Sequence, residues 1–310
     1  MDNTPINLRW PYGRFANSIF VIAFAKYIQS TGAEVRLVTD PDDSPAYGRE
    51  LIRLGLNKGL AHDFEKTEFL TRLLLRNSSP EESLAEINNR KNATTIFETF
   101  AQFRTNLFRS TPNYLEGMQS LFAEGTLLGK CLSQGKVCYR RRSYLGLHLR
   151  RGDYVNSEKN HEFMYTLEAS ELPRLIDVIH NNLPASREMD IYLATDDKEI
   201  GSGFLEAVPP PTNGAERLGA WIMNRDAALL TQIGRVLPFH SDEFRELIHD
   251  FVMLCNASIM VTSNSSFSVL ASLQNSSATR FFQYLPDAEG LLEFDPFDRP
   301  VLLRARGLKL

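Results

Sequence analysis

Residues 144–154 of this 310-residue chain read Tyr-Leu-Gly-Leu-His-Leu-Arg-Arg-Gly-Asp-Tyr. The short apolar run in this segment predicts a buried strand over residues 144–149, and the polar run that follows marks the carboxyl end of that strand. The strand period of two places Gly146, His148 and Arg150 on one face. The segment therefore predicts a strand that delivers a histidine and an arginine to one edge of a sheet.

Two later segments show the same pattern of an apolar strand followed by polar residues. Residues 189–194 end in Thr195, Asp196 and Asp197, and residues 259–261 end in the run Thr-Ser-Asn-Ser-Ser. Helical periodicity fills the intervals, with helices predicted over residues 172–179, 242–255 and 267–274. Strands that alternate with helices predict an α/β domain with a parallel sheet, whose ligand lies at the carboxyl ends of the strands.

The amino-terminal part predicts a second α/β unit. A strand over residues 6–10, a loop over 11–17, a helix from Ser18 and a strand over 35–38 form the start of a βαβ unit. Residues 49–109 are mostly helical in pattern, with a capped helix start at Ser79 and Pro80. We place the boundary in the glycine-rich, basic stretch 125–142, which gives domains over residues 1–138 and 139–310.

Composition and missing motifs exclude several classes of protein. The formal net charge of −4 provides no general basic surface for nucleic acid. The three cysteines lack metal-ligand or disulfide spacing, and no apolar run is long enough to span a bilayer. No GxGxxG or GxxxxGK[ST] motif is present, so a dinucleotide-dependent oxidoreductase and a P-loop enzyme are excluded. No DxD motif stands in the context that would hold Mn²⁺ or Mg²⁺, so we expect no metal.

The polar segments each allow a functional and a structural interpretation. Arg150 and Arg151 suit a diphosphate, because guanidinium groups offer paired donors to phosphate oxygens, yet Arg151 could equally form an ion pair with Asp153. The run at residues 262–266 suits an anion at a helix start or plain N-capping by Ser265 or Ser266.

The acidic residues are equally open to two interpretations. Asp196 and Asp197 could accept hydrogen bonds from a ribose or a base, or could belong to a turn that caps a helix. Periodicity places Asp250 on the polar side of its helix with Glu243 and Glu246, which by itself predicts a solvated carboxylate.

Residues 148–154 resemble the HxRRGDY motif of the α-1,2-fucosyltransferase family, which uses GDP-fucose, and more weakly the core and protein O-fucosyltransferases. Other segments resemble the same family in the same order: Gly13–Asn17 with Phe20 and Ala23–Lys26, Tyr114–Ser120, Ile191–Asp197, Asp250–Cys255, and Asn264–Ser268. The chain departs from the family pattern at Ala16, Ser18, Met118, Val269 and Leu270. These departures affect the acceptor side more than the donor side.

The resemblance implies a GT-B-like fold, in which two Rossmann-like α/β domains face a cleft and the carboxyl-terminal one binds the nucleotide sugar. It implies that Arg150 binds the β-phosphate as a catalytic residue. The implied donor-binding residues are Asn17 across the cleft, His148 and Asp250 at guanine, Arg151 in shaping the loop, Asp196 and Asp197 at the ribose, and Asn264, Ser265 and Ser266 at the diphosphate. The general base is Asp153, Glu158 or His161.

The function that the resemblance implies is inverting, metal-independent transfer of L-fucose from GDP-fucose to a glycan hydroxyl, in an α-1,2 linkage to a galactoside. The partners are then GDP-fucose and a glycan acceptor, with no cofactor and no nucleic acid. Transfer of another GDP-linked sugar and GDP-sugar binding without turnover are the alternatives. We expect a cytoplasmic protein, with peripheral membrane contact as an open alternative.

Overall fold

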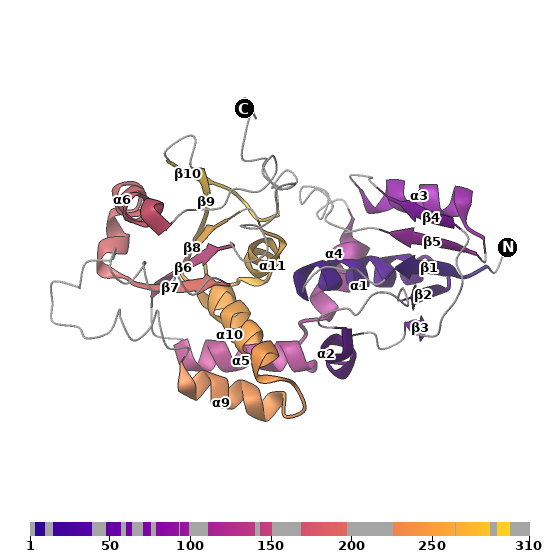
Figure 1. Ribbon diagram of the computed structural model, residues 1–310, viewed down its shortest axis with the longest axis horizontal. Helices are drawn as coiled ribbons and strands as arrows, with labels where there is room; N and C mark the ends of the chain where they lie inside the picture. Colours follow the sequence, from indigo (N-terminus) through magenta and orange to yellow (C-terminus); the bar gives the residue numbers. More distant parts are fainter. Residues whose placement is uncertain are drawn as a thin grey trace. The chain divides into compact units, whose positions relative to one another are not determined.

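The computed structural model describes most of the chain and divides it into two compact units. The described residues are 4–9, 15–38, 48–56, 60–63, 71–75, 79–92, 94–98, 111–139, 143–150, 169–196, 226–263, 265–285 and 290–297. Unit 1 holds those up to Lys130, together with Phe239–Phe244 and Phe297, and unit 2 holds the remainder. Both units combine helices with mainly parallel strands, so the chain is a mixed α/β protein (Figure 1).

Unit 1 is built on a five-stranded sheet in the order β3-β2-β1-β5-β4, with all neighbouring strands parallel. The strands are β1 (Ile6–Arg9), β2 (Val35–Val38), β3 (Ala61–Asp63), β4 (Thr71–Leu74) and β5 (Thr95–Glu98). The helices are α1 (Phe15–Ser30), α2 (Gly48–Arg53), α3 (Pro80–Arg90) and α4 (Pro112–Ser120). Helix α1 is buried on nearly all sides and contacts α3, α4 and β2, so it forms the centre of this unit.

The mostly helical interpretation of residues 49–109 is wrong, because this region supplies β3, β4 and β5. These strands have only three or four residues, and the first three residues of β5 are all buried. A short strand that is buried on both faces lacks the alternation of polar and apolar residues by which a strand is recognised. The capped start of α3 is confirmed, since Ser79 accepts a hydrogen bond from the amide of Glu82 and Pro80 is the first helical residue.

Unit 2 contains the second sheet, with the order β10-β9-β8-β6-β7 and only β10 antiparallel to its neighbour. Its strands are β6 (Tyr144–Leu149), β7 (Asp190–Thr195), β8 (Ile259–Thr262), β9 (Arg280–Leu285) and β10 (Gly290–Glu293). The strands predicted at β6, β7 and β8 are confirmed within one residue. Successive strands leave β6 first toward β7 and then toward β8, so the strand order reverses at the join between β6 and β8.

The helices of unit 2 cover the two faces of this sheet. They comprise the 3-10 turns η3 (Ala169–Glu171) and η4 (Pro184–Glu188) and the helices α6 (Leu172–Asn182), α9 (Ala227–Val236), α10 (Asp242–Asn256) and α11 (Ser266–Gln274). Figure 1 shows α6 on one side of the sheet and α10 on the other. Leu145, Leu147 and Leu149 of β6 point toward α6 and join its apolar side chains in one buried cluster.

The opposite face of the sheet packs against α10. Gly146 permits the close approach there, because a Cβ atom at this position would lie 2.8 Å from the Cβ of Ala257. The hydroxyl of Tyr144 donates to the carbonyl of Met253, which fixes the same helix over the start of β6. His148 and Arg150 continue this face beyond Gly146, so the face toward α10 changes from tightly packed to polar as β6 ends.

Helix α5 (Leu127–Tyr139) occupies most of the stretch in which the domain boundary is expected. The division between the units falls within this helix, after Lys130. Its glycines mark close packing: a Cβ at Gly135 would lie 2.3 Å from the Val252 side chain of α10. The binding roles expected for residues 1–138 and 139–310 stay predictions.

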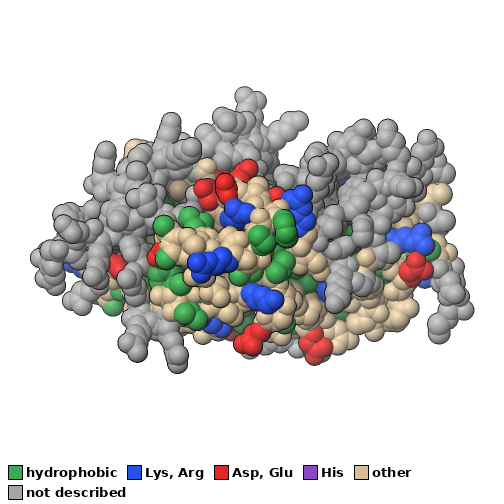
Figure 2. All heavy atoms as spheres, turned by 90° about the horizontal axis from the view of Figure 1, so that it is seen from below, with side chains coloured by type: hydrophobic (Ala, Val, Ile, Leu, Met, Phe, Trp, Pro, Cys, Tyr) green, Lys and Arg blue, Asp and Glu red, His purple; other side chains and the backbone are tan. Residues whose placement is uncertain are grey.

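The described surface mixes charged and apolar side chains. Figure 2 turns the molecule so that α9 faces the reader, and the lysine and arginine side chains visible there stand singly among acidic and apolar ones. Val137 of α5 is 76% exposed, and Cys131, Cys138 and Cys255 are free thiols. Among the described residues, no helix is long and apolar enough to cross a membrane.

Candidate functional site

The predicted site residues that the structure describes in unit 2 lie at and beside the join between β6 and β8. Strands β6 and β8 run parallel, with His148 opposite Thr262, so the segments that follow these two strands leave the sheet at the same edge. The amide of Ser263 donates to the carbonyl of His148 across this edge, at 3.0 Å. In open α/β sheets, ligands bind outside the carboxyl ends of the strands where the strand order reverses. The topology therefore selects this edge as the candidate site.

His148 is a neutral, buried side chain at the centre of the edge. It is 5% exposed, and its Nδ1 lies 2.9 Å from the Ser263 hydroxyl. Burial, followed by the charge of Arg150, lowers the pKa of His148 from 6.5 to about 4, although Asp196 and Asp250 act in the opposite direction. The Ser263 oxygen also accepts the amide proton of Arg150, at 3.3 Å, so this hydroxyl links the imidazole to the backbone where β6 ends.

Arg150 follows β6 directly and lies next to a carboxylate from the neighbouring strand. Its Nε is 3.4 Å from Oδ2 of Asp196, which follows β7, and the two side chains are 13% and 24% exposed. The register of β6 with β7 pairs Leu149 with Thr195 and so brings the next residues together. A partly exposed guanidinium held by one carboxylate keeps its charge and its direction, which suits it to bind phosphate oxygens.

Asp250 joins the site from α10. Its side chain is 13% exposed, and Oδ1 accepts a hydrogen bond of 2.5 Å from the hydroxyl of Tyr192. Helical periodicity by itself predicts a solvated carboxylate at Asp250. It does not predict this contact, because β7 places a tyrosine against the polar side of α10. The charge of Asp250 acts on the pKa of His148, so the two side chains belong to one electrostatic cluster.

Part of the serine run after β8 forms hydrogen bonds with the backbone. Ser265 is the N-cap of α11, where its hydroxyl accepts a hydrogen bond from the amide of Phe267, and it is 4% exposed. Ser266 is the first residue of α11 and is half-buried. The ring of Phe267 packs on His148 with their centroids 5.4 Å apart. The start of α11 thus supports His148 directly, and the phosphate roles of Ser265 and Ser266 stay predictions.

The remaining predicted site residues are Asn17, in unit 1, and six that the structure does not describe. Asn17 is half-buried in the first turn of α1 in unit 1, and this helix begins at Phe15, three residues earlier than predicted. The residues outside the described part of the chain are Arg151, Asp153, Glu158, His161, Asp197 and Asn264. The identity of the general base and the role of Asn17 therefore stay predictions.

Two residues of the site were missed by sequence reasoning. Ser263 stands inside the run at residues 262–266, but only its later members were selected. Tyr192 lies in the middle of β7, where an aromatic residue is typical of a buried strand. Its position opposite Gly146, on the face toward α10, identifies it, and that position required the strand register.

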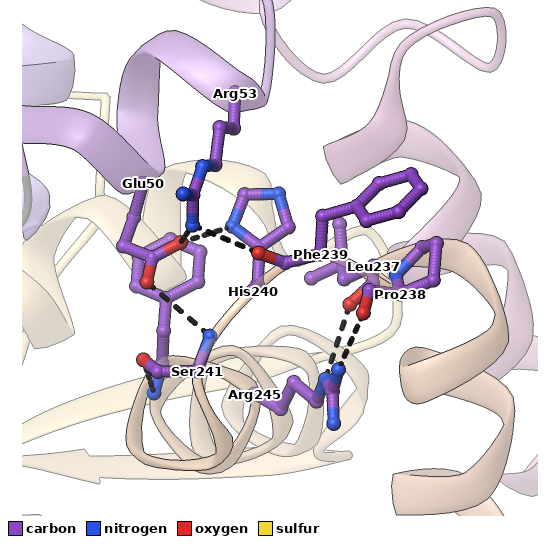
Figure 3. Close-up of polar contacts among 9 residues, drawn as sticks. Glu50, Arg53, Leu237, Pro238, Phe239, His240, Ser241 and Arg245 are labelled. Atoms are coloured by element: carbon purple, nitrogen blue, oxygen red, sulfur yellow. Dashed lines mark hydrogen bonds and ion pairs between the residues drawn. The ribbon is translucent and has the colours of Figure 1, made fainter.

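A second polar cluster lies in unit 1, and Figure 3 shows it in close-up. Glu50 of α2 accepts from Nδ1 of His240 at 2.6 Å and from the amide of Ser241 at 3.2 Å, while Arg53 donates to the carbonyl of Phe239. Burial raises the pKa of Glu50, but these hydrogen bonds outweigh it and lower the pKa overall. These hydrogen bonds hold residues 239–241 against α2, so we interpret the role of the cluster as structural.

Among the described residues, no three His, Cys, Asp or Glu side chains come together as they would around a metal ion. The candidate site consists instead of one guanidinium, two carboxylates, a neutral imidazole and serine hydroxyls. Such a set can bind an anionic diphosphate and the donor and acceptor groups of a nucleoside.

No protein-family description and no curated protein sequence matches this chain. Among solved structures, it is similar to a crystal structure of POFUT1 in complex with GDP-fucose, with a TM-score of 0.37 and 9% identity over 91% of this chain and 98% of that one. It is also similar to POFUT1 in complex with GDP, with a TM-score of 0.36 and 12% identity over 89% of this chain and 96% of that one. The functional assignment rests on the chain's own residues.

Proposed function

We propose that the chain is an inverting, metal-independent fucosyltransferase that moves L-fucose from GDP-fucose to a glycan hydroxyl. One observation carries the proposal: His148, Arg150, Asp196 and Asp250 meet at the reversal of strand order in unit 2. These are residues that the resemblance to α-1,2-fucosyltransferases assigns to the donor nucleotide. Helical periodicity alone would have left Asp250 in solvent.

Each group fits one part of GDP. The guanine edge presents N–H donors at N1 and at the 2-amino group, which suit the carboxylate of Asp250. It also presents a carbonyl oxygen, which suits His148 in the tautomer that carries its proton on Nε2. The guanidinium of Arg150 suits the diphosphate, and Asp196 lies beside it as an acceptor for a ribose hydroxyl.

Arg150 also explains how bond cleavage would be assisted. When the bond between the anomeric carbon and the β-phosphate oxygen breaks, negative charge develops on GDP and positive charge on the sugar. A fixed guanidinium at the phosphate stabilises the leaving group without a metal ion, and it loses little free energy to reorientation. A carboxylate or histidine after Arg151 would accept the proton of the acceptor hydroxyl, with Asp153, Glu158 and His161 as the alternatives.

The wider arrangement belongs to the same proposal. We propose a GT-B-like pair of domains in which unit 2 binds the donor and unit 1 contributes to the acceptor side, with Asn17 near the sugar. The proposed linkage is α-1,2 to a galactoside. Transfer of another GDP-linked sugar and binding without turnover are the outcomes against which it is tested.

The first test is calorimetric and thermal-shift titration with GDP, GDP-fucose, GDP-mannose and UDP-galactose. A ligand that binds the native state raises the temperature of unfolding, and we expect this for GDP and GDP-fucose but not for UDP-galactose. Equal binding of GDP-mannose and GDP-fucose would favour another donor sugar, and binding without transfer to any galactoside would favour a binding protein. If no guanosine ligand binds, the proposal is wrong.

A further inference from the structure

The hydroxyl of Tyr192 lies within unit 2 directly behind the carboxylate that we assign to guanine. Tyr192 is 3% exposed, and its hydroxyl is 2.5 Å from Oδ1 of Asp250 and 3.2 Å from Nδ1 of His249. His249 is fully buried, and its ring is tilted against the ring of Tyr192 with centroids 5.9 Å apart. The carboxylate at the site is therefore supported by two buried side chains.

The direction of these hydrogen bonds follows from the groups involved. A carboxylate oxygen accepts, so the Tyr192 hydroxyl donates its proton to Asp250. The phenol oxygen is then an acceptor for the proton on Nδ1 of His249. The result is a one-way chain from His249 through Tyr192 to Asp250, whose last member is the partly exposed one.

This chain restricts the orientation of Asp250. A carboxylate on an exposed helix face rotates among several side-chain conformations, but here Oδ1 is tied to a hydroxyl on a rigid, buried strand. The plane of the carboxylate is thereby set before any ligand arrives. Such preorganisation strengthens recognition of a planar pair of donors, because less conformational freedom is lost on binding.

We propose that Tyr192 is a positioning residue that sets nucleobase specificity by orienting Asp250. The inference rests on the proposed function, since it takes the base to be guanine. Guanine differs from hypoxanthine by its 2-amino group, which is the second donor to a carboxylate oriented in the plane of the base. The preference for GDP over inosine diphosphate therefore measures how well Asp250 is oriented.

The test compares Tyr192→Phe with Tyr144→Phe in the full-length protein. Tyr144 is a matched control, because it is a buried tyrosine on the same face of the neighbouring strand and its hydroxyl donates to the Met253 carbonyl, not to Asp250. Calorimetric titration gives the affinities for GDP and inosine diphosphate. We expect Tyr192→Phe to lower the preference for GDP by about tenfold, as for loss of one well-oriented hydrogen bond, and Tyr144→Phe to leave it unchanged.

The outcomes separate this inference from the proposed function. If Tyr192→Phe binds GDP with the wild-type preference, Tyr192 does not set specificity, while the proposed function stands. If both variants lose the preference equally, the effect is one of general stability and the inference is wrong. If the wild-type protein does not bind GDP, the proposed function fails first and the inference fails with it.

A second pair of variants keeps the inference testable if Tyr192→Phe does not fold. In Asp250→Asn, the Tyr192 hydroxyl would hold the amide oxygen and turn the NH₂ group toward the base. That group is a donor, so the variant should prefer xanthosine diphosphate, which has a carbonyl where guanine has its amino group, by about tenfold. Adding Tyr192→Phe to this variant keeps the volume of the ring and leaves no unpartnered carboxylate, and it should remove the preference because the amide is no longer held. Persistence of the preference in the double variant would overturn the inference.

Discussion

Each of the two sheets has one point at which its strand order reverses, and the two points carry different residues. In unit 1 this point lies between β1 and β5, and there Arg9 and Glu98 form an ion pair with side chains 6% and 27% exposed. In unit 2 the corresponding join carries the neutral contact of His148 with Ser263, and the charges of Arg150 and Asp196 lie beside it, between β6 and β7. A site therefore follows from the residues at the strand ends, and the topology supplies only the place.

Arg9 and Arg150 are expected to have different roles. Arg9 is almost wholly buried, and its charge is met by Glu98 on the adjacent strand. The side chain of Arg150 is twice as exposed, and its Nε lies 3.4 Å from a carboxylate oxygen of Asp196. We expect the first arginine to stabilise its unit and the second to act on a ligand.

The largest expected effect is on transfer in Arg150→Met. Removal of the charge that stabilises the leaving group should lower kcat/KM by about a thousandfold, or about 4 kcal/mol, with little change in the unfolding temperature. The measurement is steady-state transfer from GDP-fucose. Arg280→Met is the matched control, because its ion pair with Glu293 is largely exposed and contributes little. Retention of a tenth of wild-type activity in Arg150→Met would refute the leaving-group role.

In contrast to Arg150→Met, Arg9→Met should lower stability and leave ligand binding unchanged. It leaves the Glu98 carboxylate without its buried partner, so we expect the free energy of unfolding of unit 1 to fall by about 3 kcal/mol. Hydrogen exchange of the β1 and β5 amides reports this loss, while the affinity of unit 2 for GDP should not change. The double variant Arg9→Met with Glu98→Gln should recover part of the stability, since it removes the unpaired charge as well. Faster exchange confined to unit 2 would contradict this assignment.

The buried, uncharged imidazole of His148 in unit 2 predicts that stability depends on pH. The pKa of His148 is about 4 in the folded protein and 6.5 when exposed, so between these values the unfolded chain binds the additional proton. The contribution is complete above pH 6.5 and is lost as the pH falls toward 4, for a total on the order of 3 kcal/mol. Urea unfolding across this range should show a shallower decline in His148→Gln than in wild type. Parallel curves would mean that His148 is not held neutral.

How far the sequence predicted this structure depended on strand length and burial. In unit 2, six-residue strands ending in polar runs were recognisable, and so were His148 and Arg150 at one edge. In unit 1, β1 and β2 were recognisable, but β3, β4 and β5, with three or four residues each, carried too little periodicity. The ion pair of Arg9 with Glu98 joins residues 89 positions apart. Tyr192 illustrates the same limit within the site, since its role depends on the register of β7 and the placement of α10.

The smallest expected effect compares two helix caps, one in each unit. Ser79 caps α3 in unit 1 and Ser265 caps α11 in unit 2, each through one hydrogen bond from an amide. Replacement of either serine by alanine should lower the free energy of unfolding by about 1 kcal/mol. Only Ser265→Ala should also weaken GDP binding, by a few-fold, because α11 presses Phe267 against His148. Calorimetry on both variants measures this difference. An equal loss of GDP affinity in Ser79→Ala would contradict the assignment of GDP binding to unit 2 alone.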